Sequence, residues 1–276
     1  MRFHSFRRGW LPANICVMTK LRIILLLAVL ALAGARTEGA LFGGGETKAF
    51  TTAKDSYRLK AWERAEQELA EFIKEYPKSE QIAEAVWYQA QAQFEQRKYD
   101  AVVALLQARV GQAGNLTDQY LYWLGQAQFA GTNYSAAAMT FAKLAGEHPT
   151  SPRRLEAAVN QAAALARLEQ WTNVVALLKR ADGPFRQAEQ SARGTEMAGR
   201  GFLLLAEAQL MLKDYPSVEV ALTRVGAGLS PDLEWKRRNV LCRMLAESGR
   251  AEDAARESDG MITAAENALQ NPNRLS

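Results

Sequence analysis

The sequence reads AQAQFEQRKY over residues 90–99 and GQAQFAGTNY over residues 125–134. Each stretch begins with a small residue and ends with a tyrosine nine residues later, and the second follows the first after 35 residues. Self-similarity at a period of about 20–50 residues is typical of proteins built from stacked units, none of which can bury its apolar face alone. The pattern therefore predicts a repeat architecture.

The same register extends in both directions along the chain. The small residue recurs at Ala53, Ala90, Gly125, Ala162, Ala206 and Cys242. Nine residues after each of these stand Trp62, Tyr99, Tyr134, Trp171, Tyr215 and, in the last unit, Ala251. Successive units are spaced by 37, 35, 37, 44 and 36 residues, so six units fit and only the last is degenerate.

These residue types suit two antiparallel helices joined by a short turn. A small side chain is needed where the two helices come closest, so we expect a larger residue at Gly125 to push its pair apart. The aromatic residue after the turn fills the gap between the helices. We also expect Ser79, Ser151 and Ser230 to cap the helices that follow them, because serine is a preferred N-cap residue.

One unit carries enough of this pattern to suggest a family. The third unit contains Trp123, Leu124, Gly125, Ala127, Phe129, Tyr134, Ala137, Phe141, Leu144 and Pro149. In these residues and in its period it resembles a tetratricopeptide repeat. The first and second units are good matches too, and the likeness covers residues 46 to 268. The resemblance implies an all-α, right-handed superhelical solenoid of about six antiparallel helix pairs over residues 46–270, with a tail over 271–276.

Two departures from the register need separate expectations. About nine residues are added between the fourth and fifth units, around residues 183–196. They form either a loop or an extra turn on the first helix of the fifth unit. The last helix is rich in charged residues and alanine, so it can cap the array. The alternative is that the chain is the N-terminal fragment of a longer structural repeat protein.

The N-terminus indicates export. A basic start that includes Lys20 and Arg22 precedes an apolar run of about 13 residues that ends in a small-x-small site at residues 33–35. A bilayer span needs about 20 apolar residues, so a cleaved signal peptide over residues 1–35 is favoured over a membrane anchor. Met18 is a possible true start. A flexible leader is expected over residues 36–45, and the mature protein is expected to be periplasmic or secreted, without a membrane span.

Charge and residue counts exclude several classes of function. The formal net charge of the chain is +4, but residues 1–35 hold five basic and no acidic residues, so the remainder carries −1. A net charge close to zero does not favour binding to the negatively charged backbone of a nucleic acid. Cys242 is the one cysteine left after cleavage, and it is expected to be a buried packing residue. We therefore expect no metal site, no cofactor and no catalytic residues, and the protein is not expected to be an enzyme.

A candidate binding surface follows from the resemblance, which implies that the first helices line the concave face. Positions three before and four after the small residue are aromatic in units one to three, and a polar residue follows the small one. The candidate partner-binding residues are Phe50, Lys54, Tyr57, Trp87, Gln91, Phe94, Tyr122, Gln126 and Phe129. An apolar groove with a few polar groups suits a peptide or a helix of another protein. The alternative is that the rings pack between adjacent first helices, and positions 57, 94 and 129 are the set expected to be core.

The favoured function is a scaffold or adaptor of the bacterial cell envelope. The first three units resemble periplasmic repeat proteins that coordinate cell division or assemble outer-membrane proteins. The two-lysine, two-asparagine clamp of chaperone-binding repeats is absent, since its positions hold Phe50, Lys54, Trp87 and Gln91. An accessory subunit of an envelope enzyme is the second hypothesis, and a cluster of titratable residues in the groove would distinguish it.

Overall fold

The computed structural model describes residues 44–226 and 230–270, with side chains up to residue 266. The expected signal peptide, most of the expected leader and the expected tail lie outside the described residues. The described residues form helices and no strand. The first helix is described from residue 44 to residue 58, so Gly44 and Gly45, which the sequence analysis assigned to the leader, are helical.

Six helix pairs follow one another along the chain. The first helix pairs with α2 (Trp62–Glu75), and the next pairs are α3 (Ile82–Glu95) with α4 (Tyr99–Arg109) and α5 (Thr117–Ala130) with α6 (Tyr134–Glu147). The remaining pairs are α7 (Arg154–Arg167) with α8 (Trp171–Lys179), α10 (Glu196–Met211) with α11 (Tyr215–Val225), and α12 (Pro231–Glu247) with α13 (Ala251–Gln270). Two short 3₁₀ turns, η1 (Val110–Gln112) and η2 (Gly114–Leu116), link the second pair to the third.

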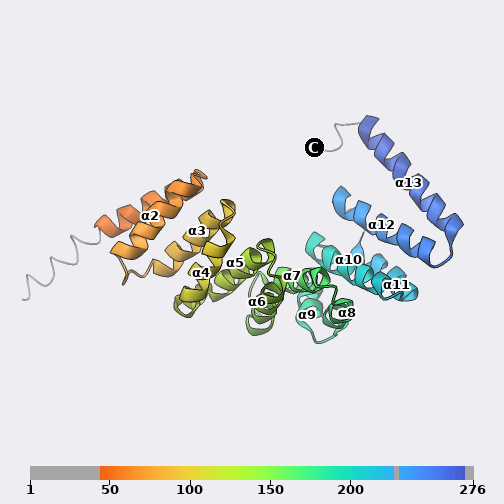
Figure 1. Ribbon diagram of the computed structural model, residues 1–276, viewed down its shortest axis with the longest axis horizontal. Helices are drawn as coiled ribbons and strands as arrows, with labels where there is room; N and C mark the ends of the chain where they lie inside the picture. Colours follow the sequence, from red (N-terminus) through yellow and green to blue (C-terminus); the bar gives the residue numbers. More distant parts are fainter. Residues whose placement is uncertain (1–43, 227–229, 271–276) are drawn as a thin grey trace, which may run out of the picture.

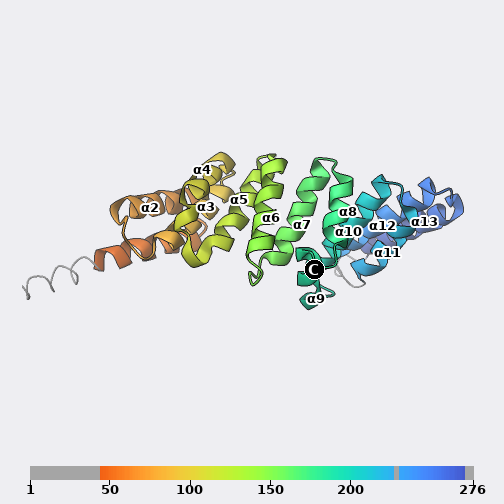
Figure 2. The same cartoon turned by 90° about the horizontal axis from the view of Figure 1, so that it is seen from below.

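The pairs stack into an arc. In Figure 1 the first helices of the middle pairs, α3, α5, α7 and α10, lie toward its open side, and α4, α6, α8 and α11 lie on its outer side. The second helix of each pair packs against the first helix of the next one. Figure 2 shows the same pairs side by side along the length of the molecule. The predicted all-α solenoid of six helix pairs is confirmed.

The repeat register coincides with the core. The small residues Ala53, Ala90, Ala162 and Ala206 are fully buried. At Gly125 an added Cβ would lie 2.7 Å from a ring carbon of Phe141 on α6. The expectation for this glycine is therefore confirmed, and the group that excludes a larger side chain is a ring rather than a backbone. In the degenerate last unit, Cys242 is half-buried and its thiol lies 3.6 Å from the carbonyl oxygen of Ala254.

Each pair turns through the same backbone conformation. The residue two before the second helix has a positive φ in all six pairs: Lys60, Arg97, Thr132, Glu169, Lys213 and Gly249. The amide that follows it donates to a carbonyl five residues back, as from Asn133 to Gln128 and from Arg250 to Leu245. This is the hydrogen bond of a Schellman-type helix end. Five of the six turns thus place a non-glycine residue in the left-handed region.

Two expectations about local structure are corrected. The added segment forms neither a loop nor an extension of α10, because residues Pro184–Ser191 make a separate short helix, α9. Ser230 caps α12 as expected, accepting from the amide of Leu233. Ser79 and Ser151 instead accept from the amides two residues ahead and precede their helices by three residues.

Candidate functional site

The nine predicted partner-binding residues lie on the first helix of each of the first three units. These helices are residues 44–58, α3 and α5. In Figure 1, α3 and α5 face the open side of the arc. The nine residues therefore lie on the helices that were expected to line the concave face. Their burial and contacts, however, divide them into three groups with different roles.

The first group is the set of aromatic residues four after the small position. Tyr57, Phe94 and Phe129 are half-buried. Each ring packs edge-on or tilted against the aromatic residue that follows the turn of its own unit, with centroid distances of 5.3, 5.3 and 5.2 Å. Aromatic pairs at this distance and angle attract through edge and face charge distributions. These rings close the end of each helix pair and leave part of their surface to solvent.

The second group is the set three before the small position. Phe50 and Tyr122 are buried, at 4% and 7% exposure, while Trp87 is half-buried. The expectation that positions 57, 94 and 129 are the core set is therefore wrong. The reason is that the ring of Phe50 packs across its own pair, 5.1 Å from the ring of Phe72 on α2.

Tyr122 is held in place by polar contacts. Its hydroxyl donates to Oε1 of Glu156 on α7 at 2.6 Å and accepts from Nε2 of Gln126 at 2.7 Å. Burial, together with the Glu156 contact, raises the pKa of Tyr122 to about 12. The guanidinium of Arg153 lies 4.4 Å from its ring centroid. Tyr122 therefore joins the third unit to the fourth.

The third group, the polar residues after the small position, also bridges units. Nζ of Lys54 lies 2.8 Å from Oε1 of Glu84 on α3, and this hydrogen bond raises the pKa of Lys54. The hydroxyl of Tyr57 donates to Oε1 of the buried Gln91 at 2.9 Å. Lys54 and Glu84 thus form an ion pair that joins the first unit to the second.

The sequence analysis missed two aromatic residues that complete this surface. Tyr88 and Trp123 stand two residues before the small position. Tyr88 lies 4.8 Å from the ring of Tyr57, and Trp123 lies 5.2 Å from the ring of Phe94, in each case the ring of the preceding unit. Their shared place in the repeat was the signal that could have identified them. In the fourth unit the same position holds Asn160, so the aromatic series ends there.

Three buried hydrogen-bond donors on the first helices of units two to four have no partner among the described residues. They are Nε1 of Trp87, Nε1 of Trp123 and Nδ2 of Asn160, on α3, α5 and α7. An unpaired buried donor costs about 1–3 kcal/mol, so such groups in a folded protein call for an explanation. Each of the three donor atoms is covered by protein, so an acceptor from outside the chain reaches it only when the side chain rotates.

The open side changes character in the later units. Val159, Leu203 and Leu210 take the aromatic positions there and are buried. Glu207 follows the small residue of the fifth unit, and burial raises its pKa. Within residues 44–226 and 230–270, no three acidic, histidine or cysteine side chains are grouped to hold a metal ion. No helix in that part of the chain is long and apolar enough to cross a membrane.

Comparison with known proteins identifies two of the units. A family model described as tetratricopeptide repeat matches residues 50–79 and 119–151. These segments fall in the first and third helix pairs, so two units of the chain match the tetratricopeptide repeat model, as the resemblance implied. The second unit, another expected match, is not among the matched residues. No curated protein matches the chain.

Among solved structures, the chain is similar to one described as the TPR2AB domain of yeast Sti1 in a complex with pHSP90. It is 14% identical, the alignment covers 79% of this chain and 97% of that one, and the TM-score is 0.34.

Proposed function

We propose that this protein is a non-catalytic scaffold of the bacterial cell envelope that binds a peptide or a helix of another protein on the open side of its first three units. Stacked helical repeats present extended concave surfaces, and their usual use is to bind other proteins. The chain contains tetratricopeptide repeats, and its open side carries half-buried aromatic rings over units one to three.

The observation that carries the proposal is the series of half-buried aromatic rings on the first helices of units one to three, together with the buried, unpaired donors of Trp87, Trp123 and Asn160. Part of each tryptophan ring faces solvent, and a backbone carbonyl of a bound peptide reaches the covered indole nitrogen when the ring shifts on binding. Tryptophan combines a large apolar face with one donor, which is why it is frequent among residues that dominate binding energy. Phe50 and Tyr122 are buried and support this surface from behind.

Crosslinking in cells tests the binding surface. A photoreactive side chain is placed at Gln126, on the open side, or at Met139, which is exposed on the outer helix α6. We expect a discrete protein adduct from position 126 and none of the same mass from position 139. Trp87→Phe combined with Trp123→Phe removes both N–H donors but keeps aromatic rings at the two positions. The amount of adduct should fall at least about tenfold, because the loss of one or more hydrogen bonds between uncharged groups weakens binding by about that factor.

The matched control is Trp235→Phe, which removes an exposed tryptophan donor from α12 outside units one to three. The adduct should be unchanged in this variant. An adduct that survives the paired tryptophan substitutions, or that forms equally at position 139, would refute binding on the open side. Mass spectrometry of the adduct names the partner, and an enzyme found there would support the accessory-subunit alternative.

The envelope setting rests on the N-terminal sequence and has its own test. The basic start and the apolar run from residue 23 to residue 33 support export, and the small residues at 33–35 support cleavage. We expect the mature protein in the periplasmic fraction, with its N-terminus at Arg36. Leu26→Arg, which interrupts the apolar run, should retain the protein in the cytoplasm. Wild-type protein found in the cytoplasm with residues 1–35 intact would contradict the proposal.

A further inference from the structure

The added helix α9 borders a hollow that the scaffold proposal does not use. The hollow measures about 390 Å³ and lies between the end of α8, α9, α10 and α11. Phe202, Leu205 and Gln209 of α10 line it, with Leu178 and Val220 on the neighbouring helices. None of the residues that line the hollow belongs to units one to three.

The hollow exists because the inserted segment changes the packing of the fourth unit. Helix α8 has 9 residues, whereas α6 has 14. The chain then turns at Gly183 into α9, whose Phe185 is fully buried. Its ring lies over Gly201, where an added Cβ would come within 2.2 Å, and 5.3 Å from the ring of Phe202. Helix α9 is therefore anchored as a wall of the hollow.

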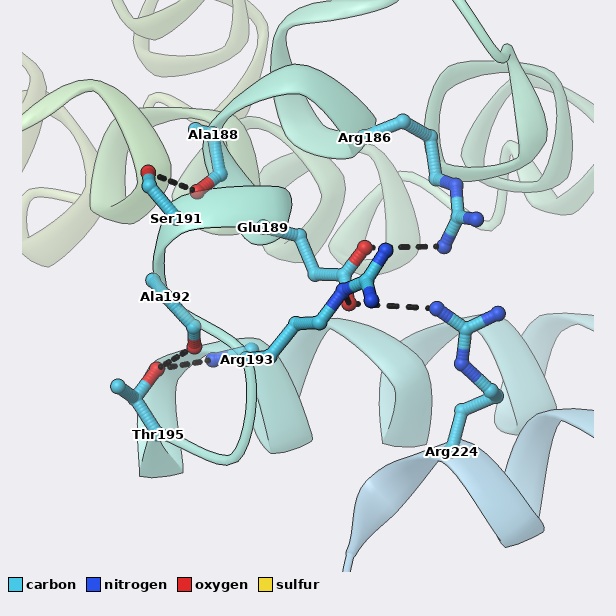
Figure 3. A network of polar contacts seen from close by, with 9 residues as sticks. Arg186, Ala188, Glu189, Ser191, Ala192, Arg193, Thr195 and Arg224 are labelled. Carbon is cyan, nitrogen blue, oxygen red and sulfur yellow. Dashed lines mark hydrogen bonds and ion pairs between the residues drawn. The ribbon is translucent and has the colours of Figure 1, made fainter.

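The residues that line the hollow are strongly basic. Lys179, Arg186 and Arg224 line the hollow, and its described lining contains no acidic residue. Glu189 of α9 has a side chain only 4% exposed and pairs with Arg186 at 3.3 Å and Arg224 at 3.2 Å, as Figure 3 shows. Arg193 approaches the same carboxylate at 3.9 Å.

The single carboxylate of Glu189 thus forms ion pairs with three guanidinium groups. The cations of Arg186 and Arg224 also lie against the ring of Phe202, at 5.6 and 4.6 Å from its centroid. These contacts hold the two side chains in fixed positions beside an apolar floor. Preorganised arginines with spare donors are suited to bind a carboxylate.

The floor of the hollow carries an unpaired acceptor. Gln209 is 2% exposed, and its Oε1 has no hydrogen-bond partner among the described residues. A buried acceptor of this kind calls for a donor. A peptide supplies backbone N–H donors, whereas a fatty acid or another apolar carboxylate without an N–H group does not.

The N-terminal part of the chain has the wrong charge to occupy the hollow. Residues 1–43 contain six basic residues and one acidic residue. Like charges repel in a partly buried site, so this segment is a poor occupant.

We propose that the hollow between α8, α9, α10 and α11 binds a peptide segment of a partner protein in which an acidic side chain stands next to an apolar one. The apolar side chain fills the space over Leu205 and beside Val220, which is 66% exposed without an occupant. The carboxylate meets Arg224 and Lys179, and a backbone N–H meets Gln209. This site adds a second surface to the proposed scaffold, and it involves none of the residues of units one to three.

The test uses the mature chain and a fluorescent, acetylated hexapeptide amide in which leucine and glutamate alternate. Fluorescence anisotropy should show saturable binding that weakens as ionic strength rises, because the contact is electrostatic and partly exposed. Replacing the glutamates of the probe by glutamine, or its leucines by serine, should each weaken binding at least about tenfold. No binding at about 1 mM peptide, or equal binding of the glutamine peptide, would overturn the proposal.

Variants of the protein locate the bound peptide. Arg224→Gln should weaken binding about tenfold or more. Lys179→Gln should weaken it about threefold; this lysine is exposed, so its loss leaves the fold intact. The matched control is Arg180→Gln, which removes an equally exposed cation that pairs with Asp182 and does not line the hollow. Equal affinity of the Lys179 and Arg180 variants would contradict the location even if Arg224→Gln fails to fold.

Two further measurements separate the remaining outcomes. Decanoate that competes through Arg224 while the peptide fails to bind would assign the hollow to a lipid-like anion and refute the peptide. Self-association that depends on Arg224, seen by sedimentation, would assign it to a second copy of this chain. Trp87→Phe with Trp123→Phe should leave peptide binding here unchanged, so failure of this site and failure of the proposed function are distinguishable.

Discussion

The first three units and the last three share one register but fill it with different side chains. In the first half, aromatic rings connect successive units, as between Tyr57 and Tyr88 and between Phe94 and Trp123. In the second half, aliphatic residues such as Leu203 and Leu210 take the aromatic positions, and a ring arrives instead from the inserted helix. The comparison indicates that the repeat fixes the positions of buried groups, whereas an inserted segment adds a contact outside the register.

Two glycines make the comparison specific. Gly125 in the third unit lies under the ring of Phe141, and Gly201 in the fifth unit lies under the ring of Phe185. The first ring belongs to the partner helix of the same pair, while the second belongs to α9. In both halves, therefore, an aromatic ring packs over a glycine, but the segment that supplies the ring differs.

The largest expected effect comes from removing these rings. Phe141→Ala and Phe185→Ala should each lower the free energy of unfolding by about 3–5 kcal/mol, because both rings are fully buried and each substitution leaves a cavity. Urea denaturation followed by circular dichroism measures the loss, and hydrogen exchange locates it in α5–α7 or in α9–α10. A cost below about 1 kcal/mol for Phe185→Ala would show that α9 is a surface addition. It would contradict the claim that the ring of Phe185 stabilises the second half as the ring of Phe141 stabilises the first.

The next effect comes from filling the space under the rings. Gly125→Ala and Gly201→Ala should each destabilise by about 1–3 kcal/mol through overpacking, even though alanine favours helix more than glycine does. The added Cβ would lie 2.7 Å from Phe141 in the first case and 2.2 Å from Phe185 in the second, so Gly201→Ala should cost more.

The control for the glycines is a double variant. Phe185→Leu should recover part of the cost of Gly201→Ala, because residues in contact are energetically coupled. It should not recover any of the cost of Gly125→Ala, which lies in another unit. Additive effects for Phe185 and Gly201 would contradict a direct contact between them.

The two glycines also show what the sequence could predict. Gly125 occupies the small-residue position of the repeat, so its role followed from the period alone. Gly201 stands five residues before its small residue, Ala206, and its ring lies on an insertion that has no counterpart in the other units. Period and residue type therefore predicted the six pairs and their buried positions, but not contacts made by a segment outside the register.

The same limit applies to the candidate surface. The sequence assigned the nine residues to the first helices of units one to three, but it could not rank their burial, because Phe50 and Tyr122 are covered by neighbours that no spacing reveals. Tyr88 and Trp123 were missed, although both have a fixed place in the repeat. The basic hollow could not have been predicted, because Arg186 approaches Arg224 only when α9 packs against α7 and α8.

A third comparison concerns two glutamates with opposite environments. In the first half, burial alone would raise the pKa of Glu66, but hydrogen bonds from Lys98, Gln93 and Gln96 outweigh it and hold the pKa below its usual value. In the second half, burial raises the pKa of Glu207, which the cations of Arg243 and Lys236 offset only in part.

The pH dependence of stability should therefore have opposite signs in the two halves. The pKa of Glu66 is lower in the folded state, so its contribution is present above pH ~4.5 and is lost as pH falls. Glu66→Gln should cost about 1 kcal/mol at pH 7 and little at low pH. The pKa of Glu207 is higher in the folded state, so its contribution is lost as pH rises. Glu207→Gln should stabilise at pH 7 and be neutral below pH ~4.5, and urea midpoints measured across this range that move in one direction for both variants would contradict the assignment.

The smallest expected effect concerns the turns, where the last unit differs from the five before it. Thr132 has a φ of 63°, and Gly249 holds the same position in the last pair with a φ of 82°. A β-branched residue is strained in the left-handed region by about 1–2 kcal/mol, and the greater flexibility of unfolded glycine offsets about half of that. Thr132→Gly should therefore stabilise the chain by about 0.5–1 kcal/mol, measured as a higher urea midpoint. Gly249→Ala should destabilise through backbone strain alone, because an added Cβ meets no atom within 4 Å. A destabilising Thr132→Gly would mean that its side chain contributes more to the turn than its backbone conformation costs.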